Sequence, residues 1–241
     1  NVKFIVPQDE LDIIKEASKQ LDYIALSYYQ SDVIAGSGTI YLKTGAQSLQ
    51  EGTLIIAGSS VKAGYTVLGG EVAGLEFGTI IVTNASLRIA ENTRLKVSGD
   101  FLNYGRVDAE SGSSVELVGN SPATFVGDTV FKEIVCKVPG KVLKVKDGAV
   151  LSVDELCYFA GGSLSRINFS SLEGGAWSLK LAEGAISSMV NLNLSGCDAS
   201  QGKTLTAANS TLTGCENVTA EDVGIEADYG ADSSGFLVGC N

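Results

Sequence analysis

The stretch GTLIIAGSSVKAGYTVLGGEVAGLEFGTIIV, residues 52–82, contains three short apolar runs that begin in the same way. GTLII, GYTVL and GTIIV each start at a glycine, and related runs lie before and after them, at residues 38–42 and 92–97. The threonines of the five runs are Thr39, Thr53, Thr66, Thr79 and Thr93, so the steps are 14, 13, 13 and 14. Hairpins impose no fixed step, whereas each strand of a solenoid restarts at the same place on the cross-section. The spacing therefore predicts a solenoid of short strands.

A later stretch, GKVLKVKDGAVLSVDEL at residues 140–156, shows the alternation of half-buried strands. It predicts one strand over Val142–Val145 and another over Val150–Val153, separated by a tight Lys-Asp-Gly turn. Successive side chains of a strand point to opposite faces, so we expect the apolar residues to face a core and the lysines to face water. The lysines in question are Lys141, Lys144 and Lys146.

The composition is typical of strands and turns. Of 241 residues, 44% are apolar but only 7% aromatic, and the chain has 29 glycines and 3 prolines. The strands are too short and too numerous for a doubly wound fold, and no helical pattern between them would cover a parallel sheet. A β-helix avoids this problem, because its sheets cover one another's inner faces. We therefore predict an all-β solenoid over residues 32–241, with Gly, Asn and Asp in left-handed conformations at its corners.

The N-terminal segment, residues 1–31, has a different pattern. Within it, QDELDIIKEASKQL at residues 8–21 places Leu11 and Ile14 at helical spacing, and Asp9 is suited to the N-cap. An open solenoid end exposes strand edges and apolar core. We therefore expect this segment to form a helix that caps the first coil.

The five cysteines are spaced by about one coil. Cys136 and Cys157 are 21 apart in the sequence, Cys197 and Cys215 are 18 apart, and Cys240 follows 25 further on. Residues one coil apart stack at the strand spacing of about 4.8 Å, which suits a pair of buried thiols and also permits a disulfide. A metal site is disfavoured, because the chain has no His and no Cys-x-x-Cys motif.

The chain is acidic, with 28 Asp and Glu against 17 Lys and Arg and a net charge of −11. This charge disfavours nucleic acid and anionic membranes as partners. No stretch approaches 18 consecutive apolar residues, so no membrane insertion is expected. The acidic end lacks the spacing of known calcium loops and gives only a weak indication of a cation site. Its acids are Glu216, Glu221, Asp222, Glu226, Asp228 and Asp232.

Two stretches carry a resemblance to a known class of proteins. WSLKLAEGAISSMVNLNLSGCDASQGKTLTAANSTLTGCENV at residues 177–218 and ATFVGDTVFKEIVCKVPGKVLKVKDGAVLSV at residues 123–153 resemble coils of secreted bacterial β-helix adhesins. The resemblance covers residues 114–218 well and residues 36–113 more loosely. These are filamentous-haemagglutinin-like or autotransporter-passenger-like proteins with a pectin-lyase-like fold. The resemblance implies a right-handed parallel β-helix displayed extracellularly or on a bacterial cell surface. Its partners would be extracellular glycans or proteins, or further segments of the same chain. The N-terminal sequence, which lacks a Met start, is interpreted as that of a processed or excised piece.

The residues give no recognisable catalytic constellation. The absence of His excludes Ser-His-Asp and Cys-His catalysis. Carboxylate pairs stay conceivable, and the nearest candidates are Asp108 with Glu110 and Glu221 with Asp222, which are interpreted as solvated turns. We therefore predict no catalytic, cofactor-binding or metal-binding residue, and a non-catalytic structural or adhesive role. The alternative is a polysaccharide-binding or polysaccharide-degrading β-helix (a lyase or glycosidase), which a lateral cleft of clustered acids and arginines would favour.

Five asparagines begin Asn-x-Ser/Thr triplets. In a secreted eukaryotic protein such triplets could carry glycans, whereas in a solenoid rich in Asn and Ser they arise from composition. We favour composition. The residues are Asn84, Asn168, Asn193, Asn209 and Asn217.

Overall fold

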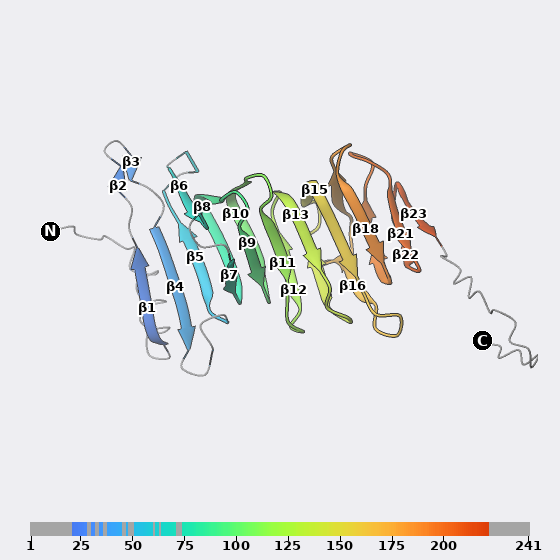
Figure 1. Cartoon of the computed structure of the whole chain (residues 1–241), viewed down its shortest axis with the longest axis horizontal. Coiled ribbons are helices and arrows are strands. Elements are labelled where there is room, and N and C mark those ends of the chain that lie inside the picture. The colour runs from blue at the N-terminus through green and yellow to red at the C-terminus, as the bar shows by residue number, and fades with distance from the viewer. Residues whose placement is uncertain are drawn as a thin grey trace, which may run out of the picture.

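The computed structural model is all-β in the residues that it describes, which are 21–27, 30–31, 34–35, 38–44, 47, 51–59, 61–62, 64–70 and 74–221. In this part of the chain every regular element is a strand, and the strands line up along one long axis (Figure 1). The helix predicted at residues 8–21 lies outside the described residues, apart from Leu21, which begins a strand. No helix able to span a membrane is found among the residues described.

Two long sheets contain nearly all the strands. The strands of the first sheet are β1 (Leu21–Ser27), β4 (Gly38–Thr44), β5 (Thr53–Ala57), β6 (Tyr65–Leu68), β8 (Thr79–Ile89), β10 (Phe101–Ala109), β12 (Ala123–Val126), β14 (Val142–Val145), β16 (Ile167–Ser171), β19 (Leu192–Ser195) and β22 (Thr211–Thr213). The strands of the second are β7 (Gly74–Phe77), β9 (Arg94–Val97), β11 (Ser114–Leu117), β13 (Thr129–Cys136), β15 (Val150–Ala160), β17 (Trp177–Leu181), β18 (Ile186–Val190), β20 (Cys197–Asp198), β21 (Leu205–Ala208) and β23 (Val218–Glu221). A separate pair joins β2 (Gln30–Ser31) to β3 (Ile34–Ala35).

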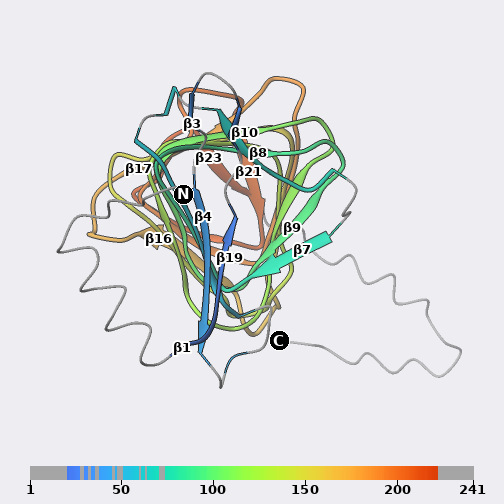
Figure 2. The ribbon, with the colours of Figure 1, turned by 90° about the vertical axis from the view of Figure 1, so that its left-hand side faces the viewer.

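Each turn of the chain, here called a rung, lays strands along three faces. One rung consists of β16 on the first face, β17 on the second and β18 on the third. The next rung consists of β19, β20 and β21, which pair in parallel with β16, β17 and β18 respectively. Viewed along the long axis, the rungs surround a common interior (Figure 2). The arrangement is consistent with a β-solenoid.

Parallel stacking begins at β5 rather than near residue 32, which corrects the predicted boundary. β4 pairs antiparallel with both β1 and β5. The reason is the length of the connection, because a parallel crossover needs about a dozen residues or more, and only residues 45–52 separate β4 from β5.

The regular threonine step has a different meaning from the one predicted. Thr53 pairs with Thr79, so these two residues are one rung apart, which is two threonine steps. Thr66 lies between them on the second face, where it pairs with Leu87. The two steps that make this rung are therefore not equivalent. The first leads from the first face to the second, and the next passes the third face, where β7 lies, before the following rung begins.

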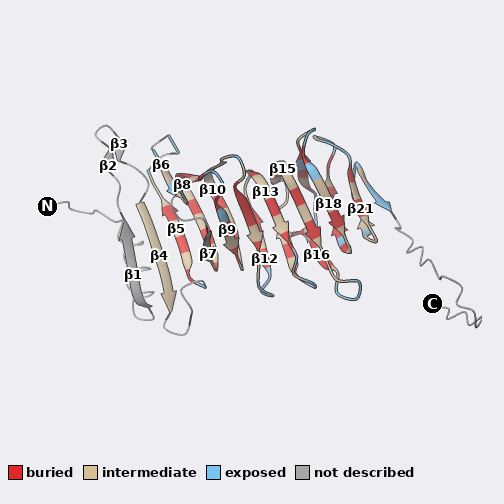
Figure 3. Ribbon diagram, in the orientation of Figure 1, coloured by how far each residue is buried: buried red, intermediate tan, exposed pale blue. Residues whose placement is uncertain are grey.

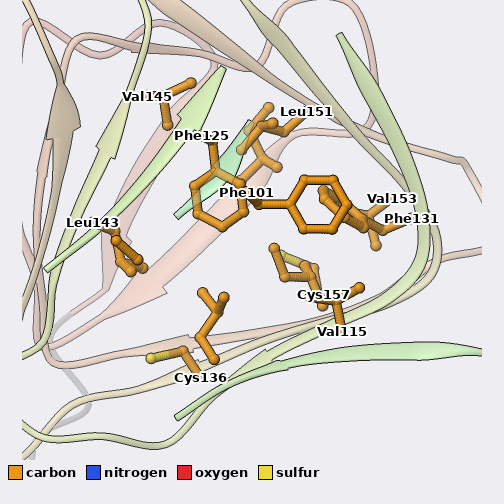
Figure 4. Packing of buried hydrophobic residues seen from close by; sticks show 14 of the residues in the cluster. Phe101, Val115, Phe125, Phe131, Cys136, Leu143, Val145, Leu151, Val153 and Cys157 are labelled. Carbon is orange, nitrogen blue, oxygen red and sulfur yellow. The ribbon is translucent and has the colours of Figure 1, made fainter. Parts of the chain in front are cut away.

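The interior is filled by aliphatic and aromatic residues, and buried residues alternate with more exposed ones along most of the described strands from β5 to β21 (Figure 3). Aromatic rings meet there both between and within rungs. The ring centroids of Phe101 and Phe131, on successive rungs, lie 5.5 Å apart, and those of Phe169 and Trp177, on one rung, lie 4.5 Å apart (Figure 4 shows the first pair). Such contacts add to the free energy gained by burying apolar surface. The interior is therefore a packed core rather than a channel.

The strands predicted around residues 140–156 are observed, but one of the three lysines is placed differently. Lys144 and Lys146 face outward, whereas Lys141 is 1% exposed, so its predicted exposure was wrong. Lys141 lies at the corner just before β14, and its three N–H groups are shared among four carbonyl oxygens at 2.8–2.9 Å from Nζ, those of Ser98, Val118, Gly119 and Ser121. These carbonyls compensate the cost of burying the ammonium group.

Asparagines at corners adopt the left-handed conformation, as the sequence predicted. Asn84, Asn92, Asn191, Asn209 and Asn217 have φ between 45° and 57°. Asparagine tolerates this region better than other residues with a Cβ atom. Left-handed corners therefore account for five of the eleven asparagines in the sequence.

Replacing Asn191 with alanine is expected to lower the free energy of unfolding by about 1–2 kcal/mol. Alanine would be strained at φ 57°, and the bond from Asn191 Nδ2 to the Gly161 carbonyl at 3.0 Å would be lost. Asn191→Gly keeps the conformation and should cost less. Urea denaturation of the two variants measures the difference, and equal stability would contradict the role given to φ.

Candidate functional site

An open hollow on the second face is the best candidate for a binding site. It has a volume of about 390 Å³ and extends over β10, β13, β15 and β17 to the loop after β20. Val130, which is 42% exposed, lines it together with Val150. Arg106, Asp108 and Lys180 contribute charged groups. A concave surface with apolar and polar groups is suited to ligand binding.

A charged cluster lies at the β10 end of this hollow. The hydroxyl of Tyr65 donates to Asp108 Oδ2 at 2.6 Å, and Arg106 Nε donates to Asp108 Oδ1 at 2.9 Å. Arg88 lies over the Tyr65 ring, with its Cζ 4.0 Å from the centroid. Three consecutive strands of one sheet, β6, β8 and β10, thus bring these four side chains together.

The electrostatics of the cluster favour an ionised, fully paired Asp108. Partial burial acts to raise the pKa of Asp108, but the hydrogen bonds from Tyr65 and Arg106, with the charges of Arg106 and Arg88, prevail and lower it. A carboxyl group with a lowered pKa is a poor general acid at neutral pH. The arrangement suits Asp108 to holding Arg106 and Tyr65 in place.

Glu110, the predicted partner of Asp108, is engaged elsewhere. Its Oε1 lies 3.6 Å from Arg88 Nε, and its Oε2 accepts the backbone N–H of Glu91 at 3.1 Å. Arg88 therefore lies between the Tyr65 ring and Glu110. The two carboxylates are near each other in sequence, but each is committed to its own partners.

The second predicted pair is only half described. Glu221 ends β23, and its backbone carbonyl accepts the N–H of Asn209 at 2.8 Å. Asp222, Glu226, Asp228 and Asp232 lie outside the described residues, so the weak indication of a cation site there stays untested. Within the described part of the chain, no group of three or more His, Cys, Asp or Glu side chains could hold a metal ion.

Glu133 is a perturbed acid that the sequence did not single out. Burial raises its pKa, the charge of Glu155 adds to the rise, and Arg94 opposes it. Glu155 in turn accepts hydrogen bonds at 3.0 Å from the Ser111 hydroxyl and from the Gly112 N–H. A register shift between β13 and β15 places Glu133 opposite Leu156, next to Glu155, and no local sequence motif marks that shift. Neither glutamate lines the hollow on the second face.

The cysteines fall into one stacked pair and one offset pair. The residues that follow Cys197 and Cys215, Asp198 and Glu216, form a parallel bridge, so the two cysteines occupy equivalent positions on adjacent rungs. Cys136 pairs instead with Phe159, and Cys157 with Ile134, so the expected stacking of these two was wrong by two positions. The four cysteines described are free thiols, and Cys240 lies outside the described residues.

The five asparagines of the Asn-x-Ser/Thr triplets lie either at corners or on the outer side of the first face. Asn84, Asn209 and Asn217 are left-handed corners. Asn168 and Asn193 stack on the outside of the first face, where Asn193 Nδ2 donates to Asn168 Oδ1 at 2.8 Å. Corner geometry accounts for three of the five triplets without any modification.

A second hollow, of about 540 Å³, lies where the first face meets the second. Hydroxyl groups of Ser170, Ser195 and Thr213 come from three successive strands of the first face, and Lys144 Nζ donates to Ser170 Oγ at 2.8 Å. The adjoining loop is held by Asp147, which accepts hydrogen bonds from the Ser171 hydroxyl and the Gly175 N–H. The lining of this second hollow has no acidic side chain, unlike that of the first.

Asp147 should make the fold sensitive to acid. The hydrogen bond from Ser171 and those from backbone N–H groups lower the pKa of Asp147, although burial acts against them. Its stabilising contribution is therefore present above the ordinary aspartate pKa and is lost as the pH falls through the lower, folded-state value. Asp147→Asn should flatten the dependence of the melting temperature on pH in this acidic range, as followed by circular dichroism. An unchanged slope would show that Asp147 does not contribute.

Comparison of the chain with protein-family models, with curated proteins and with solved structures finds no match. The resemblance to passenger-type adhesins therefore depends on the sequence features alone, and the fold and the two hollows are the basis for any functional argument.

Proposed function

We propose that the chain is a non-catalytic structural or adhesive segment of a secreted or surface-displayed bacterial protein. The observation that carries the proposal is the continuous parallel stack from β5 to β23 around a packed interior. In such a stack each rung contacts mainly its neighbours, so the array lengthens without redesign and presents long lateral surfaces. This property suits a protein that extends away from a cell surface and presents its lateral surfaces to partners.

The pairing of charged side chains on the outside supports the same proposal. Asp108 binds Arg106, Lys132 binds Asp154 at 2.8 Å, and Lys146 binds Glu173 at 2.9 Å. Each pair except the first links strands or turns of successive rungs. Paired groups of this kind stabilise a surface rather than supply reactive groups, although each exposed pair contributes only about 1 kcal/mol or less.

We also propose that the rungs wind in a right-handed sense. Connections between parallel strands of one sheet are right-handed in about 98% of cases, because the twist of the strands favours that hand. The resemblance to bacterial β-helix adhesins supports the same hand. An experimental electron-density map of the rungs tests it directly, and left-handed winding would overturn this part of the proposal.

The adhesive role can be tested with a binding assay in which the purified chain is attached to beads at high density. Any binding should be spread along a face, so we expect capture of extracellular glycans or glycoproteins by beads and little binding by the monomer. The same chain is incubated with acidic and neutral polysaccharides, with and without calcium, and should release no product. Formation of reducing ends or unsaturated products that is lost on changing an acidic residue would overturn the proposal.

Polysaccharide binding in the hollow on the second face is the second candidate function. The observation that favours it is the combination of Val130 and Val150 with the charged Arg106, Asp108 and Lys180 over several strands. Lys180 is exposed, so Lys180→Glu should weaken binding of an acidic polysaccharide without affecting the fold. Lys137→Glu, an exposed lysine outside this hollow, is the matched control. Equal affinity of the two variants in titration calorimetry would exclude the hollow as the binding site.

A further inference from the structure

Cys197 and Cys215 are in register on adjacent rungs near the end of the described stack. The Glu216 N–H donates to the Cys197 carbonyl at 2.9 Å, and the Ala199 N–H donates to the Glu216 carbonyl at 2.9 Å. This ladder fixes the two cysteines side by side. Parallel neighbours are separated by about 4.7–4.9 Å, which lies within the Cα separation of about 4.4–6.8 Å found in disulfides.

Both thiols belong to the interior. Cys197 is fully buried in the core, and Cys215 is half-buried and packs against the same core. A left-handed glycine precedes each cysteine, Gly196 at φ 66° and Gly214 at φ 58°, so the chain enters both positions in the same conformation. The side chains therefore leave equivalent backbones on the same side.

We propose that Cys197 and Cys215 are a disulfide-forming pair that links the last two described rungs when a small-molecule disulfide such as oxidised glutathione is present. The proposal is independent of the adhesive role, because it requires only that oxidant. The other described cysteines do not offer the same geometry. Cys136 and Cys157 are two positions out of register, and each faces a different residue across the ladder.

The reaction balances as two thiol–disulfide exchanges. The Cys215 thiolate, the more exposed of the two, attacks oxidised glutathione, forms a mixed disulfide and releases one glutathione thiolate. The Cys197 thiolate then attacks the Cys215 sulfur, forms the protein disulfide and releases the second glutathione thiolate. Two protein thiols are oxidised, one glutathione disulfide is reduced to two thiols, and the two protons pass to solvent or to the leaving thiolates.

The second step should be the slower one. Burial raises the pKa of Cys197, and the neighbouring Cys215 adds to the rise, so little Cys197 thiolate is present at neutral pH. The rate of disulfide formation should therefore increase with pH. It should also increase with mild denaturant, because local opening of the rung that contains Cys197 would expose its thiol.

The sequence offers a direct test with the full chain. Lys203 lies between the two cysteines, and no Lys or Arg follows it, so trypsin cleavage there gives a fragment of residues 204–241. After incubation with oxidised glutathione and blocking of free thiols, this fragment should stay attached on a non-reducing gel and be released by reductant. Cleavage at Glu216 separates Cys215 from Cys240, so mass spectrometry of the linked peptides identifies the partner.

Two variants make the outcome decisive. Cys215→Ser should release the fragment even without reductant, whereas Cys240→Ser should leave it attached. Both substitutions are small, Cys215 lies outside the fully buried core, and circular dichroism checks that the strands persist in each variant. A fragment released without reductant from the oxidised wild-type chain would overturn the proposal, as would a linked peptide that contains Cys240 in place of Cys215.

Discussion

Replacing Lys141 with methionine is expected to lower the free energy of unfolding by about 3–5 kcal/mol. Methionine matches the length and apolar body of lysine but donates no hydrogen bond. The change leaves the carbonyls of Ser98, Val118, Gly119 and Ser121 without the shared donor at a buried corner. Because these acceptors belong to the backbone, no second substitution could remove them. In other proteins, replacing both partners of a buried ion pair with apolar residues can leave the free energy of unfolding unchanged. That compensation is not possible at Lys141, because its partners are backbone carbonyls.

Lys144→Met is the matched control for this prediction. Lys144 lies three residues later, at the centre of β14, and its Nζ has one hydrogen bond, to Ser170 Oγ. Its replacement should cost about 1 kcal/mol or less. Urea denaturation followed by circular dichroism measures both variants. Similar losses for the two would mean that the carbonyls around Lys141 find other donors, and the role assigned to the buried ammonium group would be wrong.

Lys141 also shows where local sequence patterns stop being informative. The alternation in KVLKVKDGAVLSV correctly predicted the strand Val142–Val145 and the start of the next strand at Val150. The same alternation gave Lys141 the environment of Lys144, because period two says nothing about the corner that precedes a strand. The carbonyls that surround Lys141 come from residues 20–43 positions earlier in the chain, one and two rungs away.

The threonine step illustrates a similar limit for the architecture. Regular spacing predicted stacked short strands, and parallel stacking is observed from β5 onward, but the threonines do not share one place on the cross-section. The spacing could not say whether one step was a whole rung or only part of one, because that depends on loop lengths. Thr53 pairs with Thr79, not with Thr66, and this pairing decides the matter.

The candidate site depends even more on register. Asp108 and Glu110 were recognised as acids, but Tyr65 and Arg88 join them only because β6, β8 and β10 are neighbours in the sheet. Glu133 and Glu155 meet through a shifted pairing between β13 and β15. The spacing of the cysteines correctly placed Cys197 and Cys215 in register, but the same argument failed for Cys136 and Cys157.

Replacing Trp177 with alanine should lower the free energy of unfolding by about 3–5 kcal/mol. Trp177 is the largest fully buried side chain described, and its ring lies 4.5 Å from that of Phe169, centroid to centroid. Its Nε1 donates to the Ser195 carbonyl on the next rung at 3.0 Å. Alanine would therefore leave a cavity in the core and remove a hydrogen bond that joins two rungs. Since rungs are coupled mainly to their neighbours, the effect should be largest for the strands that adjoin β17.

Two further variants separate the cavity from the hydrogen bond. Trp177→Phe keeps a ring against Phe169 but loses the indole N–H, and should cost about 1–2 kcal/mol. Leu172→Ala truncates a large side chain that is 43% exposed, and should cost much less than Trp177→Ala because no cavity forms. Circular dichroism is the measurement of choice, because Trp177 is the only tryptophan in the chain and its fluorescence disappears with it. If alanine and phenylalanine at position 177 were equally destabilising, the hydrogen bond to Ser195 would account for the loss, and filling of the interior by the ring would not.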